Sequence, residues 1–445
     1  RLEEAKASLS QAIVLKPDYA GAYNNLGNTL QQLGRLEESE ASYRQTILLK
    51  SRFFEAHSNL GNILQKLGRL KESEASLRLA IVLKPDYSVA HNNLGNTLKE
   101  LGRLDESEAS YRQAIAFKPD YANAYNNLGV TLQELGRLEE AEASYRQAIG
   151  LSFDYAEAYS NLGLILKELN KLEEAEACYR QAIVFKNDFS QAHHNLGITL
   201  KELGRLDESE AHFRKAIALK PDYVDAHSNL LFLKSSTSFN ATHYLEDAQN
   251  FSDAIGMKIS SQFSEWFCSK DPKHLRIGFV SGDFKAHPVG YFLEGLLAQL
   301  QSSSLELYAY PTSDSVDELT VRVRALFHSW VPLVGKSDND AAKRIHDDNI
   351  HILIDLSGHT KHNRLPVFSW KPAPIQVSWL GYFASTGLSE IDYVLGDPFV
   401  TPHEEANHFI EKIWQLPESY LCLTPPDIDL EVGPFPALSN GFLTF

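Results

Sequence analysis

Apolar residues recur with a helical period along the first half of the chain. Segments such as AYNNLGNTLQQL and LEESEASYRQTILL place apolar side chains three and four positions apart, as on one face of a helix. The pattern has a period of 34 residues, and each unit carries a leucine followed by a glycine, at Gly27, Gly61, Gly95, Gly129, Gly163 and Gly197. We therefore expect stacked helix pairs over residues 1–234, with one continuous core and a long concave surface.

The pattern changes after Leu233. The polar run KSSTSFN is expected to be a linker, one or two helices are expected within residues 243–268, and residues 235–272 together form a helical linker. From residue 273, short apolar runs alternate with helical stretches, and strands are expected in LRIGFVSGD, LELYAYP, HILIDLSG and PIQVSWLG. Such alternation predicts an α/β domain with a parallel sheet covered by helices on both faces. The final run, SNGFLTF, is also strand-like.

Small residues recur at two kinds of position in the repeats: where the two helices of a unit touch, and where a helix ends. Glycine and alanine at the contact points let the two helices of a unit approach closely. A second set suits the left-handed residue that follows a helix: Gly34, Gly68, Gly102, Gly136, Gly204 and, as a substitute, Asn170. The repeated acids, such as Glu37, Glu38 and Glu40, are expected to form a solvated outer face.

One asparagine recurs at the same place in every first helix of the repeats. We call this set the asparagine ladder: Asn25, Asn59, Asn93, Asn127, Asn161, Asn195 and Asn229. Asparagine is a poor interior helix former, so its repetition needs a reason. A carboxamide offers both a donor and an acceptor, so a row of them could hold an extended peptide backbone of any sequence. The alternative is that each amide caps its helix or bonds the neighbouring repeat.

Charge and cysteine content narrow the class of protein. The formal charge of −16 argues against nucleic-acid binding, which requires a basic face. Cys178, Cys268 and Cys422 lie far apart, so a disulfide framework or structural zinc site is not expected and a reducing cytoplasm fits best. No apolar run is long enough to cross a membrane. Residue 1 falls inside a repeat and Met257 is the sole methionine, so the chain is expected to be an internal fragment.

Residues that could take part in binding or catalysis come directly after the predicted strands. Asp283, His287, Ser357, His359 and Tyr382 come directly after predicted strands, where ligands bind in parallel sheets. The chain has no GxGxxG, P-loop, GxSxG or HExxH signature. The run HDDNIH, from His346 to His351, has unsuitable spacing for a metal ion and is interpreted as a solvated helix end.

Both halves together resemble one family. A 34-residue unit with these small residues, and with Pro17, Pro85, Pro119 and Pro221 at its end, resembles the tetratricopeptide repeat. Followed by RIGFVSGDFKAHPVGYF and KPAPIQVSWLGY, it resembles the protein O-GlcNAc transferases. The resemblance implies a catalytic region of two Rossmann-like lobes, of which residues 273–445 would be the first. The donor-binding lysine would lie in the second lobe, so this chain alone is expected to bind acceptor protein without turning over.

The resemblance also implies site residues. The family pattern D-F-x-x-H-P falls on Asp283, Phe284, His287 and Pro288, with His287 in the active site and Asp283 linked to proton removal. A G-[HY]-T motif and a WLGY segment imply an acceptor or sugar site made by His359, Thr360, Arg364, Leu380, Gly381 and Tyr382. The chain departs from the family at Phe383 and Ala384, where Pro-Gly is usual, which affects the backbone of the acceptor-side loop.

The implied function is transfer of GlcNAc from the nucleotide sugar UDP-GlcNAc to Ser and Thr of acceptor proteins, with inversion and without a metal ion. The repeats would recruit these proteins through the asparagine ladder. Two alternatives stay open from the residues. One is transfer of another sugar, as in the related fucosyltransferases of SPINDLY type. The other is a non-catalytic scaffold, in which the repeats bind partners and the second domain is degenerate.

Overall fold

A computed structural model describes residues 1–237, 240–259, 261–269, 272–301 and 303–422. The chain divides into two compact units. The first comprises Arg1–Leu219 and the second begins at Lys220, so the last helix of the repeat pattern packs within the second unit. The strand-like run predicted at residues 439–445 lies outside the described residues.

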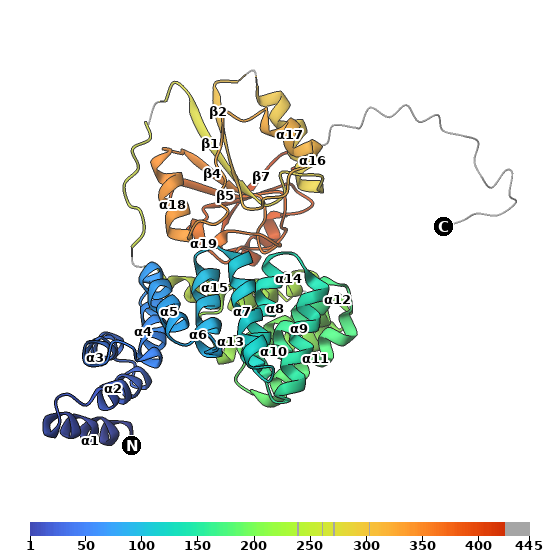
Figure 1. The fold of residues 1–445 in the computed structure, drawn as a ribbon. Coiled ribbons are helices and arrows are strands. Elements are labelled where there is room, and N and C mark those ends of the chain that lie inside the picture. Colours follow the sequence, from blue (N-terminus) through green and yellow to red (C-terminus); the bar gives the residue numbers. More distant parts are fainter. Residues whose placement is uncertain (238–239, 260, 270–271, 302, 423–445) are drawn as a thin grey trace, which may run out of the picture. The chain divides into compact units, whose positions relative to one another are not determined.

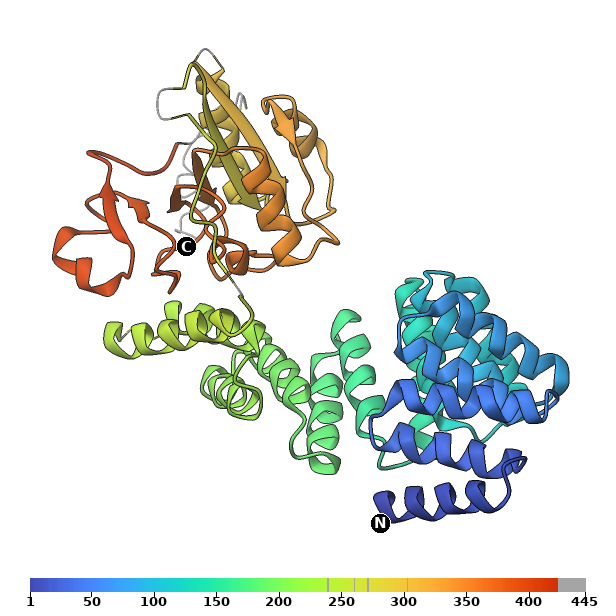
Figure 2. The same ribbon diagram turned by 90° about the vertical axis from the view of Figure 1, so that its left-hand side faces the viewer.

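The first unit is an array of helix pairs, as the periodicity predicts. Consecutive helices pack side by side, and each pair stacks on the next (Figures 1 and 2). The helices are α1 (Leu2–Leu15), α2 (Ala20–Gln32), α3 (Leu36–Leu49), α4 (Phe54–Lys66), α5 (Leu70–Leu83), α6 (Ser88–Glu100), α7 (Leu104–Phe117), α8 (Ala122–Glu134), α9 (Leu138–Leu151), α10 (Ala156–Glu168), α11 (Leu172–Phe185), α12 (Ser190–Glu202) and α13 (Leu206–Leu219). The predicted left-handed residues have positive φ, for example +75° at Gly34 and +59° at Asn170.

The recurring glycines of the first helices set how closely each pair can pack. A Cβ atom built on Gly129 would lie 2.6 Å from the ring of Tyr145, which is fully buried. Tyr111 and Tyr179 occupy the same position in the neighbouring repeats and meet Gly95 and Gly163 in the same way. A buried side chain therefore fills the space that each missing side chain leaves, and it is aromatic in every one of these repeats except that of Gly61, where Leu77 takes its place.

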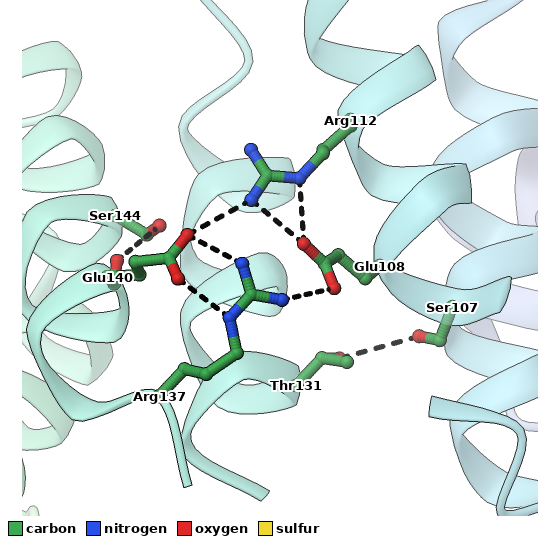
Figure 3. Close-up of polar contacts among 7 residues, drawn as sticks. All are labelled: Ser107, Glu108, Arg112, Thr131, Arg137, Glu140 and Ser144. Atoms are coloured by element: carbon green, nitrogen blue, oxygen red, sulfur yellow. Dashed lines mark hydrogen bonds and ion pairs between the residues drawn. The ribbon is translucent and has the colours of Figure 1, made fainter. Parts of the chain in front are cut away.

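The repeated acids form more than a solvated face. Arg112 and Glu108 of one repeat and Arg137 and Glu140 of the next close an Arg–Glu ring (Figure 3). The Glu108 side chain is only 13% exposed and accepts from Arg112 at 2.8 Å and from Arg137 at 2.7 Å. Glu40 joins Arg44 and Arg69 in the same way, so the expectation of a solvated face is wrong for this position.

We expect the Arg–Glu ring to make the repeat array sensitive to salt. Replacing Glu108 with glutamine should lower the melting temperature of the helical array at low salt, because two arginines of adjacent repeats lose their shared carboxylate. Raising NaCl to 1 M should shrink the difference, since salt screens exposed ion pairs. Circular dichroism at 222 nm measures both effects. Glu139→Gln, an exposed acid beside the ring, is the matched control; an equal shift in both variants would contradict this role.

The second unit joins two helices to a seven-stranded parallel sheet of order β3-β2-β1-β4-β5-β6-β7. Its elements are α14 (Val224–Ser235), α15 (Ala241–Gly256), β1 (Leu275–Ser281), α16 (Pro288–Leu300), β2 (Leu305–Pro311), α17 (Glu318–Arg324), β3 (Ser329–Trp330), α18 (Asp338–Asp347), β4 (Ile352–Asp355), α19 (Leu365–Phe368), β5 (Ile375–Ser378), β6 (Tyr393–Gly396), the 3-10 helix η1 (His403–His408) and β7 (Lys412–Gln415). The four predicted strands and the DAAKRIHDD helix are confirmed.

Helices cover both faces of the sheet, as expected. In Figure 1, α16 and α17 lie against one face and α18 and α19 against the other. Along β1 the side chains alternate accordingly: Phe279 joins the core beneath α16 and α17, whereas Val280 joins the core beneath α18. The chain runs outward from β1 to β3 and then returns to β4 beside β1. The β1–β4 crevice is thus the topological switch point, where ligands bind in sheets of this kind.

The predicted linker is more ordered than its composition indicates. α15 supplies one helix, and residues 261–268 form none. Lys234, at the start of the polar run, is 11% exposed at its side chain and pairs with Asp247 of α15 at 2.9 Å. Tyr244 and Phe251 of α15 are fully buried in the core that also contains Tyr382 and Leu388. This helix is therefore part of the second unit's core.

Candidate functional site

His287 and Asp283 lie together in the loop that joins β1 to α16. The Nδ1 atom of His287 is 3.7 Å from Oδ2 of Asp283, and its side chain is 43% exposed. Asp283 is buried, with 12% of its side chain exposed. His287 is also the N-cap of α16, where its Nδ1 accepts from the backbone N–H of Val289 at 3.3 Å. An exposed imidazole backed by a buried carboxylate can accept and release a proton at a ligand.

The loop that carries this pair is fixed by close backbone packing. The N–H of Ala286 donates to Asp317, the N-cap of α17, at 2.6 Å. A side chain at Gly290 would meet the backbone oxygen of Lys285, so α16 can lie directly against the loop. Pro288 is the first residue of α16 and has a helix-compatible φ. These contacts hold His287 at the carboxyl end of β1, beside the switch point.

The loop after β4 approaches the same crevice and carries a buried acid. Asp355 is fully buried, and its oxygens accept from the backbone N–H groups of Ser357 at 3.2 Å and Gly358 at 2.7 Å. Burial raises the pKa of Asp355 to about 7, because the two N–H groups offset only part of the cost of a buried charge. The Ser357 hydroxyl is buried without a hydrogen-bond partner among the described residues. The Ser357 hydroxyl at the switch point could therefore form a hydrogen bond to a ligand.

Asp355 gives a testable pH dependence. A carboxyl whose pKa is higher in the folded than in the unfolded chain favours the folded state most at low pH, and this stability is lost as pH rises from about 4 to about 7. Asp355→Asn should remove that loss. The unfolding free energy of the variant relative to the wild type should rise by about 1.4 kcal/mol per pH unit in that window.

Urea unfolding followed by tryptophan fluorescence measures this change, because all five tryptophans lie in the second unit. Asp397 after β6 is the matched control. Burial acts to raise its pKa, but backbone N–H groups of Val400, Phe399 and Tyr420 lower the pKa overall. Asp397→Asn should therefore lose relative stability as pH rises. Parallel pH profiles for the two variants would contradict the assignment.

His359 is buried and does not present a ring atom to solvent. It is 3% exposed, with Nδ1 at 3.0 Å from the Ser228 hydroxyl and Nε2 at 3.0 Å from the Thr386 carbonyl. The rings of Phe251 and Tyr382 pack edge-on against it. Burial lowers its pKa to about 3, so the imidazole is neutral near pH 7. Both ring nitrogens of His359 thus have partners within the chain, and its place in an acceptor or sugar site stays a prediction.

The loop after β5 is held against the loop after β4 with little space between the backbones. Leu380 has a φ of +77°, a strained conformation for a leucine. A Cβ at Gly381 would lie 2.0 Å from the backbone oxygen of Leu356. Tyr382 is 6% exposed and its hydroxyl bonds to Tyr244 at 2.7 Å, so Tyr382 anchors the loop from below. Phe383, one of the family departures, is 62% exposed.

The other two predicted site residues lie in the loop that follows β4. Thr360 is half-buried, and its hydroxyl donates to the Ser357 carbonyl at 2.8 Å. Arg364 pairs with Asp338 at the start of α18 at 2.8 Å and donates to the Lys336 carbonyl at 3.1 Å. The guanidinium of Arg364 is thus used to tie the loop to α18. Direct contact of these residues with a substrate stays a prediction.

The ladder asparagines already bond the neighbouring repeat. The amide nitrogen of Asn127 donates to Asn92 at 3.1 Å and to Asn96 at 3.2 Å in the preceding repeat. Asn59 makes both corresponding bonds, to Asn24 and Asn28, and Asn161 makes the first of them, to Asn126. This is the alternative considered from the sequence, and it does not exclude peptide binding, because a carboxamide also has an acceptor oxygen. The peptide-binding role of the ladder stays a prediction.

Sequence reasoning missed the buried supports of the site. Glu411, just before β7, accepts from the Ser385 hydroxyl at 2.7 Å and the Thr386 N–H at 2.7 Å. Ser228 and Asn363 bond across from α14 to the β4 loop. No local sequence pattern marks these residues. The prediction that the HDDNIH run is a solvated helix end is wrong for His346. Its side chain is 9% exposed, its ring stacks on Phe263, and its Nε2 bonds to the Glu265 carbonyl.

The described residues hold no group of three or more metal-ligating side chains, and none of their helices is both long and apolar enough to cross a bilayer. The three cysteines are unpaired. The residues at the switch point are an imidazole, a carboxylate, hydroxyls and backbone N–H groups. This arrangement can move a proton and hold a polar ligand.

Both the helical repeats and the α/β domain match known protein families. Residues 253–423 match the family described as Glycosyl transferase family 41. Tetratricopeptide repeat families match residues 1–34, 20–52, 54–87, 95–136, 120–184 and 190–223.

Two curated relatives and one solved structure are similar to the chain. A protein of Petunia hybrida named as a probable UDP-N-acetylglucosamine–peptide N-acetylglucosaminyltransferase SPINDLY is 37% identical over 194 residues, or 42% of this chain and 21% of that protein. A UDP-N-acetylglucosamine–peptide N-acetylglucosaminyltransferase of Caenorhabditis elegans is 35% identical over 160 residues, or 35% of this chain and 14% of that protein. A mutant O-GlcNAc transferase of Thermobaculum terrenum matches with a TM-score of 0.61 and 30% identity, over 69% of this chain and 59% of that one. The matched regions thus span about a fifth or less of the curated relatives.

Proposed function

The chain joins tetratricopeptide repeats to a glycosyl transferase family 41 domain, and we propose that it takes part in transfer of GlcNAc from UDP-GlcNAc to Ser and Thr hydroxyls of acceptor proteins. The observation that carries this proposal is the exposed His287, backed by buried Asp283, at the switch point of a parallel sheet. The names of the relatives and of the solved structure support the choice of reaction.

The reaction needs a group that accepts the proton of the acceptor hydroxyl. The hydroxyl oxygen forms a bond to the anomeric carbon, the bond from that carbon to the diphosphate breaks, and UDP leaves with inversion. His287 is the proposed proton acceptor, through Nε2. This requires the Nδ1 proton to face Asp283, 3.7 Å away, rather than Nδ1 accepting from Val289. Substrate binding would select the first arrangement. The reaction is proposed to need no metal ion.

The repeats are proposed to recruit acceptor proteins through the asparagine ladder. Asn25 is exposed, and Asn59, Asn127, Asn161 and Asn195 are partly exposed, so their amides can reach a peptide backbone. The bonds between repeats hold three of these amide nitrogens in place and leave the carboxamide oxygens to accept from peptide N–H groups. The unpaired cysteines fit a reducing compartment, so we place the protein in the cytoplasm.

The test of function is transfer itself. The protein expressed from its own gene is incubated with radiolabelled UDP-GlcNAc, or with labelled GDP-fucose, and a cell lysate. Label from UDP-GlcNAc on Ser or Thr is the expected result. Label from GDP-fucose alone would replace the donor with that of the SPINDLY-type fucosyltransferases. No label from either, with peptide binding intact, would favour the scaffold.

The ladder is tested separately by peptide binding. Replacing Asn25, Asn59 and Asn127 with alanine should weaken capture of acceptor peptides, measured by fluorescence polarisation. Asn123→Ala, an exposed asparagine of α8 outside the ladder, is the control. Because ladder amides also join repeats, circular dichroism must show an intact array. Unchanged affinity in the triple variant would contradict the proposed role of the ladder.

A further inference from the structure

The bonds between repeats follow a rule. In three repeats the ladder amide donates to the residue 35 positions earlier, which directly precedes the previous ladder asparagine. Asn59 donates to Asn24 at 3.2 Å, and Asn161 donates to Asn126 at 3.0 Å. In these repeats the first helix therefore offers a polar acceptor that the next repeat uses, whereas the Ser58 hydroxyl at the same position of α4 is buried without a hydrogen-bond partner among the described residues. The last such helix, α14, has no further repeat after it.

Ser228 stands at this acceptor position in α14, and the α/β domain supplies its partner. The amide nitrogen of Asn363, in the loop after β4, donates to the Ser228 hydroxyl oxygen at 3.2 Å. The distance is close to the 3.1 Å between Asn127 and Asn92. Asn363 thus donates to the residue of α14 that corresponds in sequence to the acceptors of the ladder asparagines. The same amide nitrogen donates to the Thr360 carbonyl at 2.9 Å, which fixes the loop's own conformation.

Ser228 passes the contact on to His359. Because Nε2 of His359 faces the Thr386 carbonyl, it carries the ring proton, and Nδ1 accepts from the Ser228 hydroxyl at 3.0 Å. Ser228 is 6% exposed and His359 is 3% exposed. One directional series of hydrogen bonds therefore runs from Asn363 through Ser228 and His359 to Thr386. It links α14 to the loops that follow β4 and β5.

We propose that Ser228, His359 and Asn363 form a joint through which α14 positions the β4 and β5 loops of the active site. These three are positioning residues, since their polar atoms are used within the chain. The catalytic part of this inference rests on the proposed transfer reaction, whereas the joint itself does not. The joint explains why the β4 loop can keep a strained backbone, with a φ of +62° at His362, next to the Asp283 loop.

The experiment measures the joint directly in the whole protein. With ¹⁵N-labelled histidine, Ser228→Ala should shift the Nδ1 resonance of His359, because that nitrogen loses its donor. Amide hydrogen exchange over residues 357–365 and 384–387 should accelerate at least tenfold. Ser228→Thr, which keeps the hydroxyl, should restore both signals. Asn363→Ala should accelerate exchange in the β4 loop. Ser236→Ala, at the exposed end of the same helix, is the control.

The possible results distinguish a failure of the proposed joint from a failure of the proposed transfer reaction. Unchanged His359 resonances and unchanged exchange in Ser228→Ala would overturn the joint. Where the wild type transfers sugar, Ser228→Ala should lower kcat about tenfold and leave KM for UDP-GlcNAc unchanged. Faster exchange with an unchanged kcat would overturn the positioning role. Absence of transfer in the wild type would instead refute the proposed function, and the two spectroscopic measurements would still decide on the joint.

Discussion

Replacing His287 with asparagine is expected to lower sugar transfer at least about 100-fold, the usual loss when a general base is removed. Asparagine is chosen because His287 is the N-cap of α16 and asparagine is a strong N-cap. The variant keeps the helix start and removes the imidazole. Initial rates with UDP-GlcNAc at saturating acceptor measure the effect, and tryptophan fluorescence confirms the fold.

Two further variants make this result specific. His274→Ala removes an exposed histidine just before β1, at the opposite end of the strand from His287, and should leave the rate unchanged. Asp283→Asn should lower kcat, because Asp283 favours the tautomer that leaves Nε2 free. A His287→Asn enzyme with wild-type rate would remove His287 from the reaction and leave the family assignment standing.

The sequence was sufficient to predict the architecture because the relevant signals are local. A period of 34 residues defined the helix pairs, and four apolar runs defined β1, β2, β4 and β5. The strands β3 and β7 were not predicted from the sequence, because they are short or partly polar. β3 has two residues, and β7 alternates exposed and half-buried positions as KIWQ. They are strands because neighbouring strands pair with them, which no local pattern encodes.

The site could be predicted only in part, for the same reason. The motif located His287 and Asp283 in one loop, where four residues separate them and proximity follows from the chain. His359 and Tyr382 follow the strand ends as predicted, but no sequence pattern indicated that both are buried. Their burial depends on α14 and α15, which lie over 100 residues earlier and supply Ser228, Leu231 and Tyr244. Long-range contacts of this kind leave no trace in local sequence.

The second large effect is expected at Glu411, which lies outside every motif. Glu411 is 4% exposed and accepts from three donors: the Ser385 hydroxyl, the Thr386 N–H and the Thr386 hydroxyl. Glu411→Ala leaves all three buried without an acceptor, at about 1–3 kcal/mol each. We expect the unfolding free energy of the second unit to fall by roughly 3–9 kcal/mol. Urea unfolding followed by tryptophan fluorescence measures it.

Glu411→Gln separates hydrogen bonding from charge. Burial raises the pKa of Glu411, so its charge is a cost to the folded state at neutral pH. Glutamine keeps an acceptor oxygen and carries no charge, so this variant should lose much less stability than Glu411→Ala. Its disadvantage relative to the wild type should shrink as pH rises, because only the wild type then buries a charge. Glu404→Ala, an exposed acid of η1, is the control.

The loss should extend beyond Glu411 itself, because its partners connect two loops. Thr386 donates to Glu411 and its carbonyl accepts from His359, whereas Ser385 accepts from Tyr244. Releasing residues 385 and 386 therefore removes the hydrogen-bond partners of Tyr244 in α15 and of His359 in the β4 loop together. Transfer should fall in Glu411→Ala even at temperatures where the unit stays folded. An alanine variant within about 1 kcal/mol of the wild type would show that these loops are held by packing alone.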